Sequence, residues 1–209
     1  ESRGLRLETI RTNLRILMPG GNFWTRRYHG AMLAAMAHFC SARLGECNIS
    51  SSIAVTYDND IDVSYPWGSH PMLDPLFSSA HMEIKHYGME VRKADKVRML
   101  GEWPEGLLQL HVCTSKQANG RNCGRCKKCT KTKMYLVANG LEQALAAFDY
   151  SSFSGKDIRS IRITSDWMYR AYELLAERFK ENEPDSDRNE ALAFALKRYR
   201  RRNFYRRIA

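Results

Sequence analysis

The stretch 113–129, CTSKQANGRNCGRCKKC, holds four of the six cysteines in the 209-residue chain. Its spacing is C-x9-C-x2-C-x2-C, so Cys113 is followed by two overlapping C-x2-C knuckles formed by Cys123, Cys126 and Cys129. Four thiolates at this spacing can surround a tetrahedral ion, and Zn²⁺ has no geometric preference that would oppose them. The spacing therefore predicts one structural zinc ion per chain, in a closed site without a catalytic role.

Two other structures are compatible with a cysteine run of this density. An iron–sulfur cluster stays open as an alternative because its cysteine runs are similarly dense. Two disulfides are disfavoured because nothing in the sequence indicates an oxidising compartment. Cations near the cysteines would offset the negative charge of zinc held by four thiolates and favour the thiolate form. These cations are Arg121, Arg125, Lys127, Lys128, Lys131 and Lys133.

The remaining two cysteines, Cys40 and Cys47, are isolated in the sequence, and we expect both to be buried as small apolar residues. Apolar residues make up 44% of the chain and charged residues 27%, which fits a globular protein and excludes wholesale disorder, collagen and coiled coil. No apolar run approaches the ~18–20 residues that span a bilayer, which excludes an integral membrane protein. No basic-then-apolar leader opens the chain, so we expect a cytoplasmic protein without membrane partners.

The basic character of the chain is concentrated near its end. The formal net charge is +10, but the run 197–207, KRYRRRNFYRR, holds one Lys and six Arg and no acid, which leaves +3 for the rest. Such a segment can bind the phosphates of a nucleic acid. The other interpretation is a solvated helix end, stabilised by cations near the negative pole of the helix dipole. Both interpretations stay open.

Apolar residues alternate with polar ones in three segments, which predicts half-buried strands. These segments are 10–16, 47–55 and 108–112. Helical patterns fall between and after them, at 28–44, 92–100 and 126–139. Strands that alternate with helices in this order are typical of a doubly wound α/β sheet.

The last sixty residues contain no segment with a strand pattern. Trp167 begins a helical repeat of apolar residues that Pro184 interrupts, and Asp187 and Glu190 have the spacing of a capping box for a second helix. We expect a helical hairpin packed against the α/β core. The predicted organisation is an α/β domain over 1–147, which includes the zinc motif, and a helical extension with a basic tail over 148–209.

A strand that ends in Cys113, then a loop, then N-C-G-R-C-x-x-C opening a helix, resembles the C-terminal half of the 7-cyano-7-deazaguanine synthase family. It also resembles the wider PP-loop ATP pyrophosphatase superfamily, or adenine nucleotide alpha hydrolases. The resemblance covers about 5–147 and includes several other pieces in the family's order. These are Thr12-Asn13-Leu14-Arg15, 24–37, His70-Pro71, 74–79 and 92–100.

The resemblance implies a partial Rossmann-like adenine nucleotide hydrolase sheet with a zinc-binding part. It implies an ATP-dependent ligase or synthase that uses Mg²⁺ and activates a carboxylate or an amide oxygen by adenylation, with release of pyrophosphate. ATP and a small acyl substrate, or an acceptor protein, would be its partners, and a homodimer would be one assembly. Related proteins act in queuosine biosynthesis, and some belong to bacterial anti-phage systems.

The resemblance also points to cationic residues as site candidates. Arg92 and Lys96 are four apart and would share one face of the predicted helix 92–100, where two cations can hold a pyrophosphate leaving group. We assign them as catalytic candidates. Asn13 and Arg15, on the polar face of the first predicted strand, and Arg27, in the loop before the Ala-rich helix, are candidates for nucleotide binding. The alternative is that all five are solvated surface residues.

Three histidines lie in a loop-rich segment that also contains several aspartates. A hydrolytic metal site could be drawn from these residues, but their spacing matches no defined motif, and we expect the histidines to make local hydrogen bonds. They are His70, His81 and His86, and the aspartates are Asp58, Asp60, Asp62 and Asp74.

The chain departs from the family in one respect. The family's S-G-G-x-D-S loop, whose backbone amides grip phosphate, does not occur, and the nearest string is Ser154-Gly155-Lys156-Asp157. Two hypotheses follow. The chain begins with Glu1 rather than Met, so it is expected to be a fragment of a longer enzyme with this loop upstream. Otherwise it is a non-catalytic, zinc-stapled module that binds nucleic acid or a protein through its basic tail.

Overall fold

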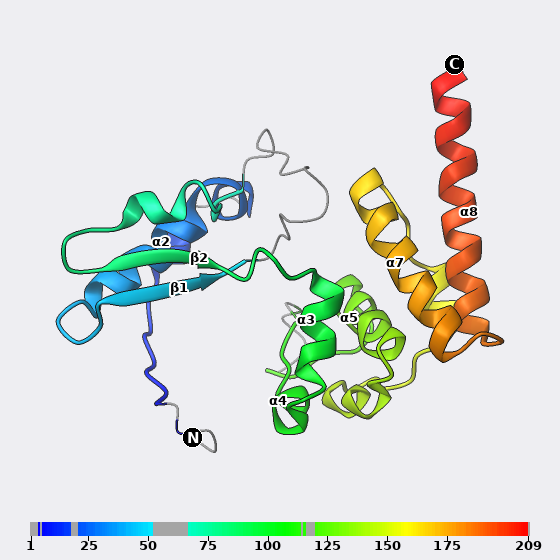
Figure 1. The fold of residues 1–209 in the computed structure, drawn as a ribbon, viewed down its shortest axis with the longest axis horizontal. Coiled ribbons are helices and arrows are strands. Elements are labelled where there is room, and N and C mark those ends of the chain that lie inside the picture. The colour runs from blue at the N-terminus through cyan, green and yellow to red at the C-terminus, as the bar shows by residue number, and fades with distance from the viewer. Residues whose placement is uncertain are drawn as a thin grey trace. The chain divides into compact units, whose positions relative to one another are not determined.

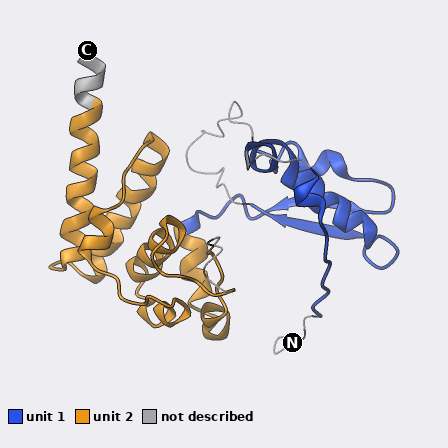
Figure 2. Cartoon of the chain, turned by 180° about the vertical axis from the view of Figure 1, so that it is seen from behind, with its two compact units in different colours: residues 1–93 blue, residues 94–209 orange. Residues whose placement is uncertain are grey.

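The computed structural model describes residues 4, 6–17, 21–51, 67–113, 115 and 120–208. The chain divides into two compact units, 1–93 and 94–209 (Figure 2). The predicted boundary after Ala147 falls inside the second unit. The protein is mixed α/β with a small two-stranded parallel sheet. Within the described part of the chain, each helix is too short or too polar to cross a membrane.

The first unit is organised around the two parallel strands, β1 (Glu46–Ser50) and β2 (Glu83–Tyr87), which pair with Ile49 opposite His86 (Figure 1). Helix α2 (His29–Phe39) follows the short turns α1 (Gly21–Phe23) and η2 (Trp24–Tyr28) and contacts β1. The buried side chains that join helix and sheet are Ala34, Ala37, Ile49, Met82 and Ile84. The predicted helix 28–44 is therefore confirmed over most of its length, and the predicted strand 47–55 is confirmed through Ser50. Its last four residues lie outside the described residues.

The predicted strand 10–16 is wrong. Only η1 (Leu14–Ile16), a single 3₁₀ turn, forms there, and no described strand pairs with it. Ile10 and Ile16 are exposed, so the alternation meets no apolar layer. A strand needs pairing partners and a buried face, and a period of two in the sequence supplies neither by itself.

The second unit consists of helices and connecting segments. They are α3 (Lys93–Leu100), α4 (Pro104–Leu108), α5 (Lys127–Ala138), η5 (Glu142–Ala147), α6 (Gly155–Arg159), α7 (Asp166–Asn182) and α8 (Asp187–Ile208). Helix α5 lies at the centre of the core, where Met134, Leu136 and Val137 are fully buried. Helices α7 and α8 form the expected hairpin and pack on each other (Figure 1). The predicted helices 92–100 and 126–139 are confirmed to within one residue at each end.

The predicted strand 108–112 is wrong as well. Leu108 is the last residue of α4, whose first turn holds Pro104, and the chain from Gln109 to Cys113 is irregular. The side chain of Asn122, rather than a neighbouring strand, makes hydrogen bonds to the backbone of this segment. Its Oδ1 accepts hydrogen bonds from the backbone N–H groups of Val112 (2.9 Å) and Cys113 (3.1 Å). Its Nδ2 donates to the carbonyl oxygens of residues 110 and 147 at 2.6 and 3.0 Å.

The string Ser154-Gly155-Lys156-Asp157 forms a helix start. Asp157 Oδ2 accepts from the backbone N–H of Ser154 at 2.8 Å, as in a capping box. Gly155 lies so close to α8 that an added Cβ would be 2.4 Å from the carbonyl oxygen of Asp187. The predicted α8 cap is also wrong, because Ser186 Oγ accepts from the backbone N–H of Asn189 at 3.1 Å. Asp187 Oδ2 instead accepts from Gly155 N–H at 2.8 Å, so these residues join α6 to α8.

Candidate metal centre

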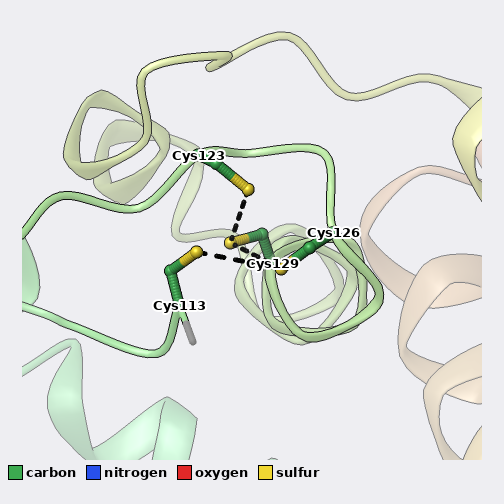
Figure 3. A group of neighbouring side chains, drawn as sticks. All are labelled: Cys113, Cys123, Cys126 and Cys129. Atoms are coloured by element: carbon green, nitrogen blue, oxygen red, sulfur yellow. Dashed lines mark hydrogen bonds between the residues drawn. The ribbon is translucent and has the colours of Figure 1, made fainter. Parts of the chain in front are cut away.

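The four cysteines of the 113–129 motif converge on one point (Figure 3). The Sγ atoms of Cys113 and Cys126 are 3.9 Å apart, as are those of Cys123 and Cys129. The Sγ atoms of Cys126 and Cys129 are 3.4 Å apart, and all four lie within 4.8 Å of one another. Four sulfurs at Zn–S distances of ~2.3 Å form a tetrahedron with edges of about 3.8 Å. The sulfur positions thus fit a tetrahedral metal ion.

The cysteines are free thiols, as are Cys40 and Cys47. The two isolated cysteines are half-buried rather than buried, and Cys47 packs against the core cluster of the first unit without belonging to it. Cys40 follows the last residue of α2 and Cys47 is near the start of β1, both at the margin of that core. Burial nevertheless raises the pKa of the Cys47 thiol.

Local sequence brings the knuckle into place. Gly124 has a φ of +75°, and a Cβ there would lie 2.2 Å from the carbonyl oxygen of Tyr150, so only glycine fits. Cys126 is the N-cap residue of α5, and Cys129 lies in the first turn of that helix. The positive end of the helix dipole favours thiolates at both positions. Asn122 holds the backbone of Cys113 against the knuckle through the bonds described above.

The electrostatic environment differs among the four thiols. The backbone N–H groups of Arg125 and Cys126 point at Cys123 and lower the pKa of its thiol to about 6. Burial raises the pKa of the Cys129 thiol above its ordinary value. The backbone N–H of Ser115 donates to Cys113 Sγ at 3.4 Å. A shared cation would offset the cost of ionising the buried thiols.

Lys133, one of the cations near the motif in sequence, is an unexpected core residue. Its side chain is fully buried, and Nζ donates to the carbonyl oxygens of Tyr150 (3.0 Å) and Ser152 (2.9 Å). Burial lowers the pKa of this ammonium group. Arg125 instead stacks on the Tyr150 ring, with 4.4 Å from guanidinium carbon to ring centroid. The segment after η5 is therefore held against α5 and the metal centre by two cations.

The candidate nucleotide-binding residues lie in the first unit. Asn13 and Arg15 do not share a strand face, because that strand is absent, and both are exposed. The Arg15 guanidinium stacks over Trp24 of η2 at 5.1 Å from the ring centroid. Arg27 is exposed in the same η2 turn. The structure thus places Arg15 beside the turn that carries Arg27.

Of the two candidate catalytic cations, only Lys96 lies within the helix as assigned. Helix α3 begins at Lys93, so Arg92 precedes its first residue, whereas Lys96 lies within it. Arg92 belongs to the first compact unit and Lys96 to the second. Both side chains are half-buried.

A buried polar cluster in the first unit brings together residues of the loop-rich segment that contains the three histidines. Asp74, the first residue of η3 (Asp74–Phe77), is completely buried and its Oδ2 lies 2.7 Å from Nδ1 of His86 on β2. The same oxygen accepts from Ser69 Oγ at 2.7 Å, and Oδ1 accepts from the backbone N–H of His70 at 3.1 Å. Nε2 of His70 and Nε2 of His86 are buried and have no hydrogen-bond partner among the described residues.

Close backbone packing holds this cluster beside α2. The backbone N–H of Gly30 donates to the carbonyl of Gly68 at 2.6 Å, and a Cβ on Gly30 would lie 2.7 Å from Asp74 Oδ1. His86 is the second-to-last residue of β2 and lies opposite Ile49 of β1. The cluster therefore lies toward the carboxyl ends of the two parallel strands. In the sequence these residues are histidines and aspartates of one loop-rich segment, a pattern that gives no indication of burial.

No protein-family model, no curated protein and no solved structure matches the chain.

Proposed function

We propose that the chain is part of an ATP-dependent adenylating ligase or synthase, whose second unit is stabilised by one structural zinc ion. The observation that carries the enzymatic part is the Asp74–His86 pair, buried toward the carboxyl ends of two parallel strands. In α/β proteins, ligands bind outside these strand ends. On this proposal β1, β2 and α2 belong to a Rossmann-like sheet of the adenine nucleotide hydrolase type.

The Asp74–His86 pair would bind the substrate rather than the phosphates of ATP. In the tautomer that carries the proton on Nδ1, His86 donates to the Asp74 carboxylate, and the lone pair on Nε2 can accept a hydrogen bond from a ligand. A buried Nε2 without a partner is costly unless a ligand supplies one. An N–H or O–H donor on the substrate, such as the amide formed after acyl activation, meets that requirement.

The phosphates of ATP and Mg²⁺ require other groups. Asn13, Arg15 and Arg27 are proposed to bind nucleotide, and Arg92 and Lys96 to stabilise the departing pyrophosphate. The family's S-G-G-x-D-S loop is absent from the 209 residues, and residues 154–157 serve as a helix cap. The proposal therefore requires that another segment supply the backbone amides that grip phosphate.

The nucleotide proposal is tested by titrating the intact gene product with ATP·Mg²⁺ in a calorimeter. Arg92→Ala combined with Lys96→Ala should weaken binding at least tenfold, because two cations near the phosphates are lost. Arg98→Ala with Lys180→Ala removes the same charge from exposed positions and serves as the control. Failure of the wild type to bind ATP·Mg²⁺ at millimolar concentration would refute the proposal, and equal weakening in the control would reject the roles of Arg92 and Lys96.

The zinc proposal has its own measurement, the metal content of protein purified without added metal. Elemental analysis should give about one zinc per chain and no stoichiometric iron, since the four sulfurs converge on one tetrahedral position. Stoichiometric iron with visible absorption would instead establish an iron–sulfur cluster. A stably folded protein without metal would contradict both.

A further inference from the structure

The second unit contains a pocket of about 400 Å³ lined by four arginines, which we call the arginine pocket. It lies where α6 and the residues that follow it pack on α8. The arginines come from two segments, Arg159 and Arg162 from the first and Arg198 and Arg202 from α8. The remaining lining residues are Ser160, Ile163, Ala195 and Tyr199.

No acidic residue lines the arginine pocket, and the nearby carboxylates are used elsewhere. Asp157 caps α6, Asp187 accepts from Gly155, and Asp166 accepts from the hydroxyl of Tyr199 at 2.8 Å. Within the part of the chain that the structure describes, none of the four pocket arginines forms an ion pair. Four guanidinium groups that form no ion pair repel each other around one cavity, and a bound anion would relieve that repulsion.

The two α8 arginines are held in place by backbone carbonyls. Arg198 Nη2 donates to the carbonyl of Ile161 at 3.1 Å, and Arg202 Nη2 donates to that of Ile163 at 2.6 Å. Arg202 also stacks on Tyr199, at 5.4 Å from its ring centroid. Its Nε–H is buried and has no hydrogen-bond partner among the described residues. The Arg202 guanidinium is therefore held in one position and still has an N–H donor that can bind an oxygen acceptor.

We propose that the arginine pocket binds a backbone phosphate of a nucleic acid. Arginine suits this ligand because its planar donors match phosphate oxygens and remain charged at any physiological pH. A polymer is favoured over a single nucleotide because exposed cations continue on the same two helices, at Lys156 on α6 and at Lys197 and Arg201 on α8. The proposal goes beyond adenylation and does not depend on it.

The test uses the full chain and a fluorescein-labelled 20-nucleotide single-stranded RNA, with anisotropy measured from 50 to 300 mM salt. Arg159→Gln combined with Arg162→Gln should weaken binding roughly tenfold at 100 mM salt. The slope of log K against log salt should fall in magnitude by about 1.4, the equivalent of two phosphate contacts on a single strand. Both side chains are exposed and make no hydrogen bond within the described residues, so the variant should fold normally.

The matched control, Arg98→Gln with Lys180→Gln, removes two exposed charges of the same unit outside the pocket. It should change the affinity less than twofold. Equal weakening in the control, or unchanged binding in the pocket variant, would overturn the proposal. Binding of AMP or inorganic phosphate at the pocket, without RNA binding, would also overturn the nucleic-acid assignment. These outcomes are independent of ATP titration, which tests the adenylation proposal.

Discussion

Cys129→Ser is expected to lose most of the bound zinc and to lower the free energy of unfolding of the second unit by roughly 3–5 kcal/mol. Its sulfur is completely buried, 3.4 Å from that of Cys126 and 3.9 Å from that of Cys123. A serine hydroxyl is a poor zinc ligand at neutral pH, so the ion would keep three thiolates. Because a structural metal site hardly exists in the unfolded chain, lost metal affinity appears directly as lost folding free energy.

The measurement combines zinc analysis with urea unfolding, with and without EDTA. EDTA should lower the free energy of unfolding of the wild type by a similar amount. It should change that of the Cys129→Ser variant little, because the substitution and the chelator both remove the zinc–thiolate interaction. Cys40→Ser is the control, since Cys40 is half-buried in the other unit and outside the cluster. A Cys129→Ser protein that retained one zinc and wild-type stability would show that the four sulfurs do not share an ion.

The convergence of the cysteines could be predicted because the determinants are local. Seventeen residues contain all four cysteines, and tetrahedral coordination restricts how such a short segment can fold. Helix α7 was predictable for the same reason, since apolar residues three and four apart define a face without reference to distant partners. The zinc ion itself remains a prediction.

The strands show where local pattern fails. The start of the alternating segment 47–55 lies in β1, which pairs in parallel with β2. The alternating segment 10–16 pairs with no strand among the described residues. In 108–112 the hydrogen bonds that a strand would need are made by the side chain of Asn122. Strand formation depends on pairing between distant segments, and a single sequence does not specify the partner.

The buried cluster around Asp74 could not be predicted for a related reason. Asp74 and His86 are twelve residues apart, and either could be an ordinary surface residue. What makes them a candidate site is complete burial of the carboxylate and the hydrogen bond between them, which appear only once η3 packs beside β2. Lys133 is a similar case, because the sequence indicated only a cation close to the cysteines.

Lys133→Met is expected to destabilise the second unit by about 2–4 kcal/mol while leaving zinc at about one per chain. Methionine can fill the buried volume, but it leaves the carbonyl oxygens of Tyr150 and Ser152 without their donor. It also loses the contact of the ammonium with the Tyr150 ring, at 4.9 Å from the centroid. The desolvation cost of the lysine is recovered, and for that reason the expected loss is smaller than two charged hydrogen bonds would suggest.

Lys128→Met separates this effect from a general loss of positive charge near the cysteines. Lys128 is exposed on the same helix, so its replacement should change the free energy of unfolding by less than about 0.5 kcal/mol. Urea unfolding of the two variants, with zinc measured on the folded proteins, gives the comparison. If Lys133 served mainly as a counter-ion to the zinc–thiolate charge, its replacement would release zinc and chelation would then have no further effect. Retained zinc with lost stability would instead place its role in anchoring residues 150–152 to α5, independently of the ion.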